Sequence, residues 1–219
     1  MNSKEKPQKL VALFGTSANP PTGQGGHLTI VEWLSQNYQF KISEQQKEFF
    51  SEIWVLPVYR HAYREKEQLI DFDHRMNMAK LNFEHFKNVQ VRDDEKEVYL
   101  SSDNPTKLGT IDTVCFLKQK YPDVFFVLTL GEDTYLDLKN GKWKDHQRLL
   151  KLVPIIVIKR KGMNNSVVGA CHLCSIPHMK ETSSSLVRNG TKDQKIYSSL
   201  NKKVLDYMKQ HGLYGFVGK

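Results

Sequence analysis

Short apolar runs alternate with amphipathic segments along almost the whole chain, and this alternation limits the folds that the chain can adopt. The central runs are almost entirely apolar and are bounded by turn-forming residues, which is typical of strands buried on both faces. We expect strands at residues 9–14, 53–57, 88–92, 124–130, 154–160 and 171–176.

The segments between these runs carry apolar residues at helical spacing, as Leu28, Val31 and Leu34 do in the first of them. We expect helices at residues 26–38, 71–86, 110–120, 134–138, 144–152, 183–189 and 194–211. Residues 40–50 form a polar connection in which we also expect helix. Residues 98–108 are expected to be a loop, because turn-forming residues gather there.

Strands that alternate with helices and are apolar on both faces predict an α/β fold with a doubly wound, mostly parallel sheet. We find no linker, repeat or low-complexity segment that would divide the chain, so a single domain over residues 1–219 is expected. Ligands of such sheets bind at the carboxyl ends of the strands. The unusual loops follow Phe14, Leu56, Leu130 and Ile158, so they are expected to converge on one crevice.

Composition and charge favour small anionic ligands over nucleic acid. The net charge is +8, but the Lys and Arg residues are scattered among acids, so an ordinary basic surface is the competing interpretation. No apolar run approaches the roughly 20 residues that span a bilayer, and residues 1–9 lack the apolar stretch of a signal peptide. A cytoplasmic location is expected, with an organelle as the alternative.

The cysteines do not indicate a disulfide framework. There are 3, at Cys115, Cys171 and Cys174, an odd number in a chain without a secretory signal. Cys171 and Cys174 have C-x-x-C spacing, but a zinc site needs about four ligands and the chain has no second pair. A metal or redox role for this pair is therefore the less favoured interpretation.

The loop between Phe14 and Leu28 is built of small residues and ends in a histidine, His27. A strand–loop–helix unit of this kind directs backbone N–H groups and the positive end of a helix dipole at one point, which suits an anion. The loop matches neither G-x-x-x-x-G-K-[ST] nor G-x-G-x-x-G. A plain strand–helix connection, with His27 as a structural cap, is therefore the alternative interpretation.

A second anion-binding pattern occurs near the end of the chain. Ser183, Ser184 and Ser185 open an expected helix, and Arg188 follows one turn later. One serine is explained as a helix N-cap. Three hydroxyls followed by a guanidinium suit a di- or triphosphate better.

These two stretches, in this order, resemble the nucleotidylyltransferase superfamily, whose motifs are (H/T)-x-G-H after the first strand and an ISSTxxR-like helix start. More narrowly, the chain is similar to the nicotinamide/nicotinate mononucleotide adenylyltransferase family, and the similarity covers nearly the whole chain. The further matching stretches are Gly131-Glu-Asp133 with Trp143, Thr110-Ile-Asp-Thr113, residues 57–66, His74-Arg75 and residues 211–214.

The chain departs from the family pattern in the first loop. The family usually has Pro-x-(His/Thr)-x-Gly-His, whereas here Thr22 is followed by Gly23-Gln-Gly25 before Gly26-His27, two residues more. Either Thr22, through a bulged loop, or Gln24 fills the first motif position.

The resemblance implies that the 5′-phosphate of a pyridine mononucleotide attacks the α-phosphorus of ATP, giving a dinucleotide and pyrophosphate. It assigns catalytic roles to His27, as a donor to the α-phosphate, and to Arg188, on the β- and γ-phosphates. The implied ATP-binding residues are Gly15, Thr16, Ser17, Thr22, Gly26, His27, Gly131, Asp133, Ser183, Ser184, Ser185 and Arg188. The implied mononucleotide-binding residues are Ser17, Lys66, Thr110, Asp112, Thr113, Trp143 and Arg160.

Several of these residues also have a plainer interpretation. Trp143 is as well explained by the core, Lys66 by a solvated surface of mixed charge, and Asp133 by a helix cap. Arg75 is equally well explained as an ion pair on its helix.

Mg²⁺ is the implied cofactor, bound mainly through the ATP phosphates and not by a metal site of the protein. The expected partners are ATP and a pyridine mononucleotide, without nucleic acid or membrane, and the sequence also allows a homo-oligomer. Amidated and acid mononucleotides are not distinguished. The alternatives are another nucleotidylyltransferase, such as a pantetheine-phosphate adenylyltransferase, and a non-catalytic nucleotide- or RNA-binding relative.

Overall fold

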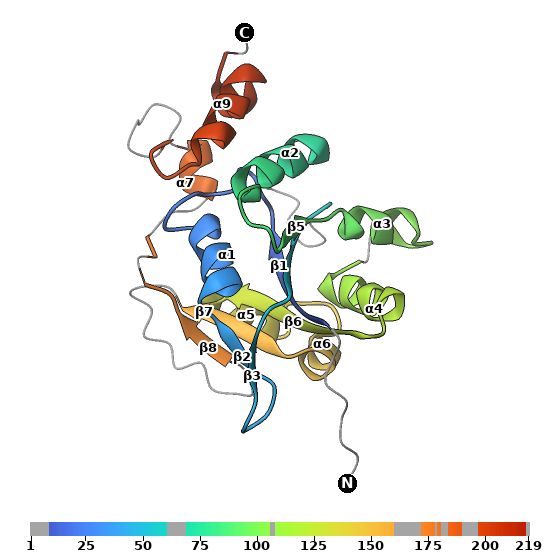
Figure 1. Ribbon diagram of the computed structural model, residues 1–219. Coiled ribbons are helices and arrows are strands. Elements are labelled where there is room, and N and C mark those ends of the chain that lie inside the picture. The colour runs from blue at the N-terminus through green and yellow to red at the C-terminus, as the bar shows by residue number, and fades with distance from the viewer. Residues whose placement is uncertain are drawn as a thin grey trace.

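Six parallel strands form the central sheet of the computed structural model, which describes residues 9–60, 69–105, 108–159, 172–177, 179–180, 184–189 and 197–217 (Figure 1). The strands are β1 (Lys9–Thr16), β4 (Glu52–Pro57), β5 (Val89–Val91), β6 (Val124–Gly131), β7 (Ile155–Lys159) and β8 (His172–Ser175). All six were expected from the sequence. They lie in the order β5-β4-β1-β6-β7-β8 with every neighbouring pair parallel, which confirms the α/β, doubly wound sheet.

Helices cover both faces of this sheet (Figure 1). They are α1 (His27–Gln36), α2 (Phe72–Phe83), α3 (Asp94–Leu100), α4 (Thr110–Lys120), α5 (Glu132–Lys139), α6 (His146–Leu152), α7 (Ser184–Asn189) and α9 (Lys202–Gln210), followed by the 3₁₀ turn η2 (Leu213–Gly215). Helix α1 packs on one face through Leu28 and Val31, whereas α4 and α6 pack on the other through Ile111 and Leu149. Within the described residues, no helix is long and apolar enough to cross a membrane.

Strand β1 shows why the sheet needs helices on both sides. Its side chains alternate between two cores, with Leu10, Ala12 and Phe14 in one and Val11 and Leu13 in the other. All five are buried. Burial of an aliphatic or aromatic side chain stabilises a fold by about 1.5–3 kcal/mol, so neither face of β1 can be left in water.

The strand order also fixes where a ligand can enter. From β1 the chain runs outward to β4 and then β5, whereas β6, on the other side of β1, leads outward to β7 and β8. The connections therefore diverge between β1 and β6. In open parallel sheets, ligands bind at the carboxyl ends of the strands at this switch point.

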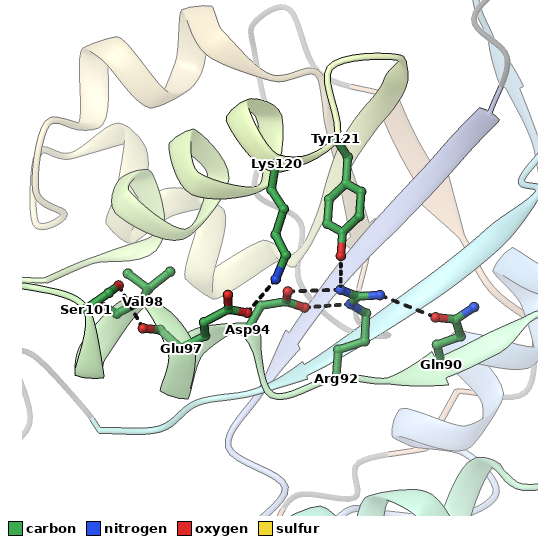
Figure 2. Close-up of polar contacts among 8 residues, drawn as sticks. All are labelled: Gln90, Arg92, Asp94, Glu97, Val98, Ser101, Lys120 and Tyr121. Carbon is green, nitrogen blue, oxygen red and sulfur yellow. Dashed lines mark hydrogen bonds and ion pairs between the residues drawn. The ribbon is translucent and has the colours of Figure 1, made fainter.

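A polar cluster ties α3 and α4 to β5 (Figure 2). The Arg92 guanidinium binds the buried Asp94 carboxylate, with Nε–Oδ2 at 2.6 Å, and also donates to the Tyr121 hydroxyl at 2.8 Å. Beside it, the Lys120 ammonium pairs with Glu97 at 2.6 Å. Because Tyr121 and Lys120 end α4 while Asp94 and Glu97 belong to α3, the cluster fixes the two helices against the sheet.

The expectation of helix at residues 40–50 is wrong. Strands β2 (Gln39–Lys41) and β3 (Lys47–Phe49) form an antiparallel hairpin there. Phe40 is buried against Phe50 and against the ring of His172 on β8. The segment carries single aromatic residues instead of a helical stripe, and tertiary contacts of those aromatics determine its structure.

Two helix boundaries also differ from expectation. Helix α3 (Asp94–Leu100) lies in a stretch for which the sequence predicted no helix, and the loop expected at residues 98–108 is wrong for residues 98–100, which belong to this helix. The expected helix at 194–211 lies partly outside the described residues, and α9 begins only at Lys202. There, the Asn201 side chain accepts the Lys203 N–H at 2.9 Å, which is an N-cap that the sequence reading overlooked.

The C-terminal helices form a third apolar cluster with α2. It contains Met78 of α2, Val187 of α7, Leu200, and Val204 and Met208 of α9. This cluster joins α2 to α7 and α9, which lie beyond the carboxyl end of β1 and near α1 (Figure 1). It therefore places the end of the chain next to the loop that follows β1.

The extra residues of that loop lie directly against the C-terminal segment. The Gly23 N–H donates to the Ser199 carbonyl at 2.7 Å. A Cβ atom on Gly23 would lie 2.8 Å from Ser199 O and 2.9 Å from Asn201 N, so only glycine fits. At Gly25, where φ is +85°, the carbonyl accepts the Lys180 N–H at 2.9 Å. The loop is thus held by two later segments of the chain.

We expect Gly23→Ala to lower the free energy of unfolding by about 1–3 kcal/mol, because the new methyl group meets backbone atoms that cannot rotate away. Gly15→Ala is the matched control: a Cβ there meets no heavy atom within 4 Å, so we expect a change below about 0.5 kcal/mol. Equilibrium urea unfolding followed by circular dichroism measures both. Equal stability of the two variants would contradict the close contact at Gly23.

Candidate functional site

The ends of four strands meet at one edge of the sheet. Thr16 of β1 is in register with Pro57 of β4, and Gly131 of β6 with Ile158 of β7. Strands β1 and β6 also pair in parallel, so the four carboxyl ends are contiguous, as expected from the sequence. At this edge a Cβ on Gly15 would meet no heavy atom within 4 Å, and the backbone of β1 is therefore accessible there.

Thr22 and His27 hold each other through two reciprocal hydrogen bonds. The Thr22 backbone N–H donates to Nδ1 of His27 at 3.1 Å, and the His27 backbone N–H donates to Oγ1 of Thr22 at 2.9 Å. The Thr22 carbonyl accepts the Leu28 N–H at 3.1 Å. Thr22 is buried, while His27 is half-buried with its ring edge-on to Phe14. The pair therefore closes the first turn of α1 and orients the imidazole.

This pairing determines which nitrogen of His27 carries a proton. Nδ1 accepts a backbone N–H, so in the neutral ring the proton lies on Nε2. His27 is also the first residue of α1, where the helix dipole favours negative charge. An Nε2–H donor at a helix N-terminus is suited to an anionic oxygen.

The extra residues of the loop form a turn beside this pair and do not replace Thr22. Gln24 is exposed, and its Oε1 accepts the Thr29 hydroxyl at 3.2 Å. The Gly25 N–H donates to the same Thr29 oxygen at 2.8 Å, and the Gly26 N–H donates to the Gly23 carbonyl at 3.0 Å. Of the two candidates for the first motif position, it is Thr22 that contacts His27.

Helix α7 brings the second predicted phosphate motif against the first. The Arg188 Nη1 donates to the Asn19 carbonyl at 2.6 Å, and the Ser184 hydroxyl donates to the Pro20 carbonyl at 2.8 Å. The Arg188 Nη2 donates to Ser185 Oγ at 3.1 Å. Residues that are more than 160 positions apart in the sequence therefore form one site, with a guanidinium beside the loop that ends in His27.

Arg75 does not form the ion pair along its helix that was one interpretation of it. Its side chain is 1% exposed and donates to four backbone carbonyls: Ile70 at 3.0 Å, Ser17 at 3.0 Å, Val58 at 2.5 Å and Tyr59 at 3.2 Å. Ser17 follows β1, and Val58 and Tyr59 follow β4. Arg75 thus joins the two loops, and Ser17 contributes a backbone oxygen to this contact.

The electrostatic environment of Arg75 includes one carboxylate with an unusual pKa. Burial raises the pKa of Glu95 to about 7, although the Tyr59 N–H, which donates to it at 3.2 Å, and the charge of Arg75 both act to lower it. Burial likewise lowers the pKa of Arg75, although electrostatic interactions with Tyr214, Glu95 and Asp71 act to raise it. The cost of burying this guanidinium is met by its carbonyl partners.

Gly131, Glu132 and Asp133 lie where β6 passes into α5. Gly131 is the N-cap of α5, and Asp133 is exposed in its first turn. Glu132, which the sequence analysis did not single out, is 0% exposed, and neither carboxylate oxygen has a hydrogen-bond partner among the described residues. The positive end of α5 stabilises acids at both positions.

The start of α4 and the Trp143 segment are joined by an ion pair. The Asp112 carboxylate accepts the Gly109 N–H at 2.7 Å and binds Lys144 Nζ at 2.8 Å. Trp143, the residue before Lys144, is half-buried against the core that also contains α4. Thr113 is buried there, and Thr110 opens the helix half-exposed. The structure therefore brings the expected mononucleotide residues of these two segments together, while Asp112 is already engaged as a cap.

Other predicted residues lie outside the described part of the chain: Lys66, Arg160, Ser183 and Cys171. Cys174 is buried on β8, and burial raises the pKa of its thiol to about 11. The thiolate is the form that binds metals and reacts with disulfides. Cys174 is thus poorly suited to either role.

Sequence reasoning missed Asn19 and Tyr214. Asn19 is 0% exposed, and its Oδ1 accepts the Tyr214 hydroxyl at 2.6 Å. A signal was present in the resemblance, because Tyr214 ends the matching stretch at residues 211–214 and Asn19 precedes two prolines. Neither pattern indicated that the two side chains meet.

The arrangement suits a polyphosphate substrate. It combines an oriented imidazole, a guanidinium, serine hydroxyls and the N-terminus of α1. In the part of the chain that is described, no group of three His, Cys, Asp or Glu side chains could hold a metal ion. Mg²⁺ that is bound through phosphates needs only one or two protein carboxylates, and the exposed Asp133 offers one.

Comparison with known sequences identifies similar proteins over nearly the whole chain. The profile of a family described as cytidylyltransferase-like matches residues 13–190. A probable nicotinate-nucleotide adenylyltransferase of Myxococcus xanthus is 28% identical over 213 residues, which is 96% of this chain and 97% of the relative. The nicotinate-nucleotide adenylyltransferase of Bacillus subtilis is 29% identical, over 94% of this chain and 98% of the relative. A probable nicotinate-nucleotide adenylyltransferase of Aquifex aeolicus is 30% identical, over 71% of this chain and 80% of the relative.

Solved structures share the fold. The nicotinic acid mononucleotide adenylyltransferase of Plasmodium falciparum, complexed with NaAD, superposes with a TM-score of 0.73 at 22% identity, over 95% of this chain and 98% of that one. A putative nicotinate-nucleotide adenylyltransferase of Vibrio parahaemolyticus superposes with a TM-score of 0.62 at 18% identity, over 95% of this chain and 97% of that one. At such identities the likeness is one of fold, and it agrees with the doubly wound sheet.

Proposed function

This chain belongs to the nicotinate-nucleotide adenylyltransferases of the cytidylyltransferase-like family, and we propose that it transfers the AMP moiety of ATP to nicotinate mononucleotide. The products are the acid dinucleotide and pyrophosphate. The choice of the acid over the amidated mononucleotide is supported by the names of the relatives. The same names, over 94–96% of the chain, favour this substrate over phosphopantetheine.

One observation carries the proposal: the loop that ends in His27 and the helix that contains Arg188 are in direct contact. Arg188 donates to Asn19, and Ser184 donates to Pro20. A plain strand–helix connection has no need of an arginine and a serine from the far end of the chain. A site that holds a triphosphate across both segments does.

The proposed reaction is a direct displacement at phosphorus. An oxygen of the mononucleotide 5′-phosphate forms a bond to the α-phosphorus of ATP, and the bond from that phosphorus to the bridging oxygen of the β-phosphate breaks. Pyrophosphate leaves with the electron pair, so the protein needs no nucleophile. The protein lowers the barrier by positioning both phosphates and by stabilising the charge that develops on them.

His27 supplies one such contribution. Its Nε2–H, which the Thr22–His27 pair favours in the neutral ring, donates to a non-bridging oxygen of the α-phosphate. Charge on that oxygen increases as the fifth bond forms, so the hydrogen bond is stronger in the transition state than in the ground state.

Arg188 and the serines of α7 hold the β- and γ-phosphates in this proposal, with Gly15, Thr16, Ser17 and Gly26 lining the path from β1. Mg²⁺ enters with ATP and neutralises phosphate charge when bound. Asp133 binds a ribose hydroxyl or helps to organise that ion. Thr110, Thr113 and Trp143 face the pyridine ring, while Lys66 and Arg160 are proposed to bind the mononucleotide phosphate. Asp112 acts indirectly, through its ion pair with Lys144.

We further propose that the enzyme works in the cytoplasm without nucleic-acid or membrane partners, as a monomer or a homo-oligomer. The scattered basic residues support small anions over RNA as ligands. A steep salt dependence of RNA binding, without pyrophosphate release, would favour the non-catalytic alternative.

The direct test is release of pyrophosphate by the purified protein with ATP, Mg²⁺ and either mononucleotide. With either mononucleotide we expect pyrophosphate and the dinucleotide to form in equal amounts. We also expect kcat/KM to be at least about tenfold higher for the acid mononucleotide, which is the effect of one charge-assisted hydrogen bond. Phosphopantetheine is the control acceptor. The proposal would be contradicted if neither mononucleotide led to release of pyrophosphate. Release with phosphopantetheine alone would identify the alternative enzyme.

We expect His27→Ala to lower kcat by about 10²- to 10³-fold, the usual effect of removing one preorganised donor, with little change in ATP affinity. His85→Ala is the control. His85 is exposed on the turn after α2, and its ring packs against that of the neighbouring Phe86. Steady-state kinetics and calorimetric ATP binding measure the two effects. A kcat close to that of the unmodified enzyme would remove His27 from the chemistry.

A further inference from the structure

The chain reverses sharply after α9 and returns toward the loop that follows β1. Gly212, Tyr214 and Gly215 have φ angles of +62°, +55° and +83°. Two of these are glycines, which adopt such angles freely, but a tyrosine in this region is unusual. A strained backbone persists where the surrounding structure requires it, and such positions are common at functional sites.

The reversal brings the Tyr214 hydroxyl to the site loop. It donates to Oδ1 of Asn19 at 2.6 Å, and Arg188 donates to the carbonyl of the same Asn19 at 2.6 Å. Asn19 is completely buried. Its side chain is thus held by the end of the chain, and its backbone by α7, three residues before Thr22.

The apolar part of Tyr214 has a separate role from its hydroxyl. The ring packs with Leu213 and Phe216 against the third cluster, which also contains Val187 of α7. Packing alone would be served as well by phenylalanine. The hydroxyl is therefore the part of the residue that relates to the site.

The hydroxyl keeps its proton in this environment. Burial raises the pKa of Tyr214 far above that of an ordinary tyrosine, and the nearby charges of Arg188 and Arg75 lower it only in part. At neutral pH the phenol is therefore a donor, and it fixes Asn19 with Oδ1 directed toward Tyr214. The amide nitrogen of Asn19 must then point in another direction, and the orientation of the side chain is set.

We infer that Tyr214 is a positioning residue for adenylyl transfer, acting through Asn19 to fix the loop that carries His27 beside Arg188. The inference rests on the proposed function for its catalytic meaning. The contact itself is independent of that function. Displacement of catalytic groups by about 1 Å can reduce a rate by up to about 10²-fold, so one hydroxyl remote from the reacting atoms can affect kcat.

Tyr214→Phe removes only the hydroxyl, and Tyr207→Phe is its matched control. Tyr207 lies on α9, and its hydroxyl contacts Nδ1 of His74 at 2.9 Å and Nδ2 of Asn77 at 3.1 Å, both on α2. Both variants lose contacts of a hydroxyl that joins the C-terminal region to an earlier segment, one contact at Tyr214 and two at Tyr207. We expect Tyr214→Phe to lower kcat about tenfold, with the KM for the mononucleotide within about twofold, and Tyr207→Phe to retain kcat.

Amide hydrogen exchange provides a readout that does not depend on activity. We expect Tyr214→Phe to increase exchange in peptides covering residues 17–27, because the loop loses one of its anchors, and Tyr207→Phe to leave those peptides unchanged. If the unmodified protein releases no pyrophosphate, the proposed function fails, while the exchange result still decides whether Tyr214 positions the loop.

A double variant tests the route through Asn19. If Tyr214 acts through that side chain, adding Tyr214→Phe to Asn19→Ala should lower kcat by less than about twofold further. The inference would be overturned by unchanged exchange at residues 17–27 together with unchanged kcat in Tyr214→Phe. Equal kinetic losses in Tyr214→Phe and Tyr207→Phe would overturn it as well, because they would show a general loss of stability.

Discussion

The reciprocal hydrogen bonds between Thr22 and His27 are the interaction on which the site depends. They close the first turn of α1, keep the loop after β1 compact despite its extra residues, and leave the imidazole with one protonation pattern in its neutral form. Without them, the glycine-rich loop would have no reason to end with a correctly oriented donor. The pair thus converts a common strand–loop–helix unit into a site with a directed N–H group.

Several distant parts of the chain hold this loop in place. Arg75 of α2 binds Ser17 at its start, Arg188 of α7 binds Asn19, and Ser199 accepts the Gly23 N–H. Each contact uses a backbone group of the loop, which has no regular secondary structure to satisfy those groups internally. The two arginines therefore contribute differently: Arg75 has a structural role between two loops, and Arg188 combines such a role with the proposed binding of phosphates.

Much of this could be predicted from the sequence, for identifiable reasons. Apolar runs such as Val124–Leu130 identify buried strands, and their alternation with helices implies the parallel sheet, because periodicity and burial are properties of the local sequence. The hairpin at Phe40 was missed because its structure depends on a ring packed from β8, as was the shared role of Asn19 and Tyr214. The two contacts join residues 132 and 195 positions apart, and no local pattern encodes them. The catalytic and binding roles of the site residues, including those of Lys66 and Arg160, stay predictions.

The protonation pattern of His27 is the most direct test of this account. Two-bond ¹H–¹⁵N correlation spectra of protein labelled with ¹⁵N-histidine distinguish the two neutral tautomers, and His27→Ala assigns the resonance among the 8 histidines. At about pH 8, where an ordinary imidazole is neutral, we predict a His27 ring that is protonated at Nε2 and unprotonated at Nδ1. A ring protonated at Nδ1, or one that populates both tautomers equally, would contradict it.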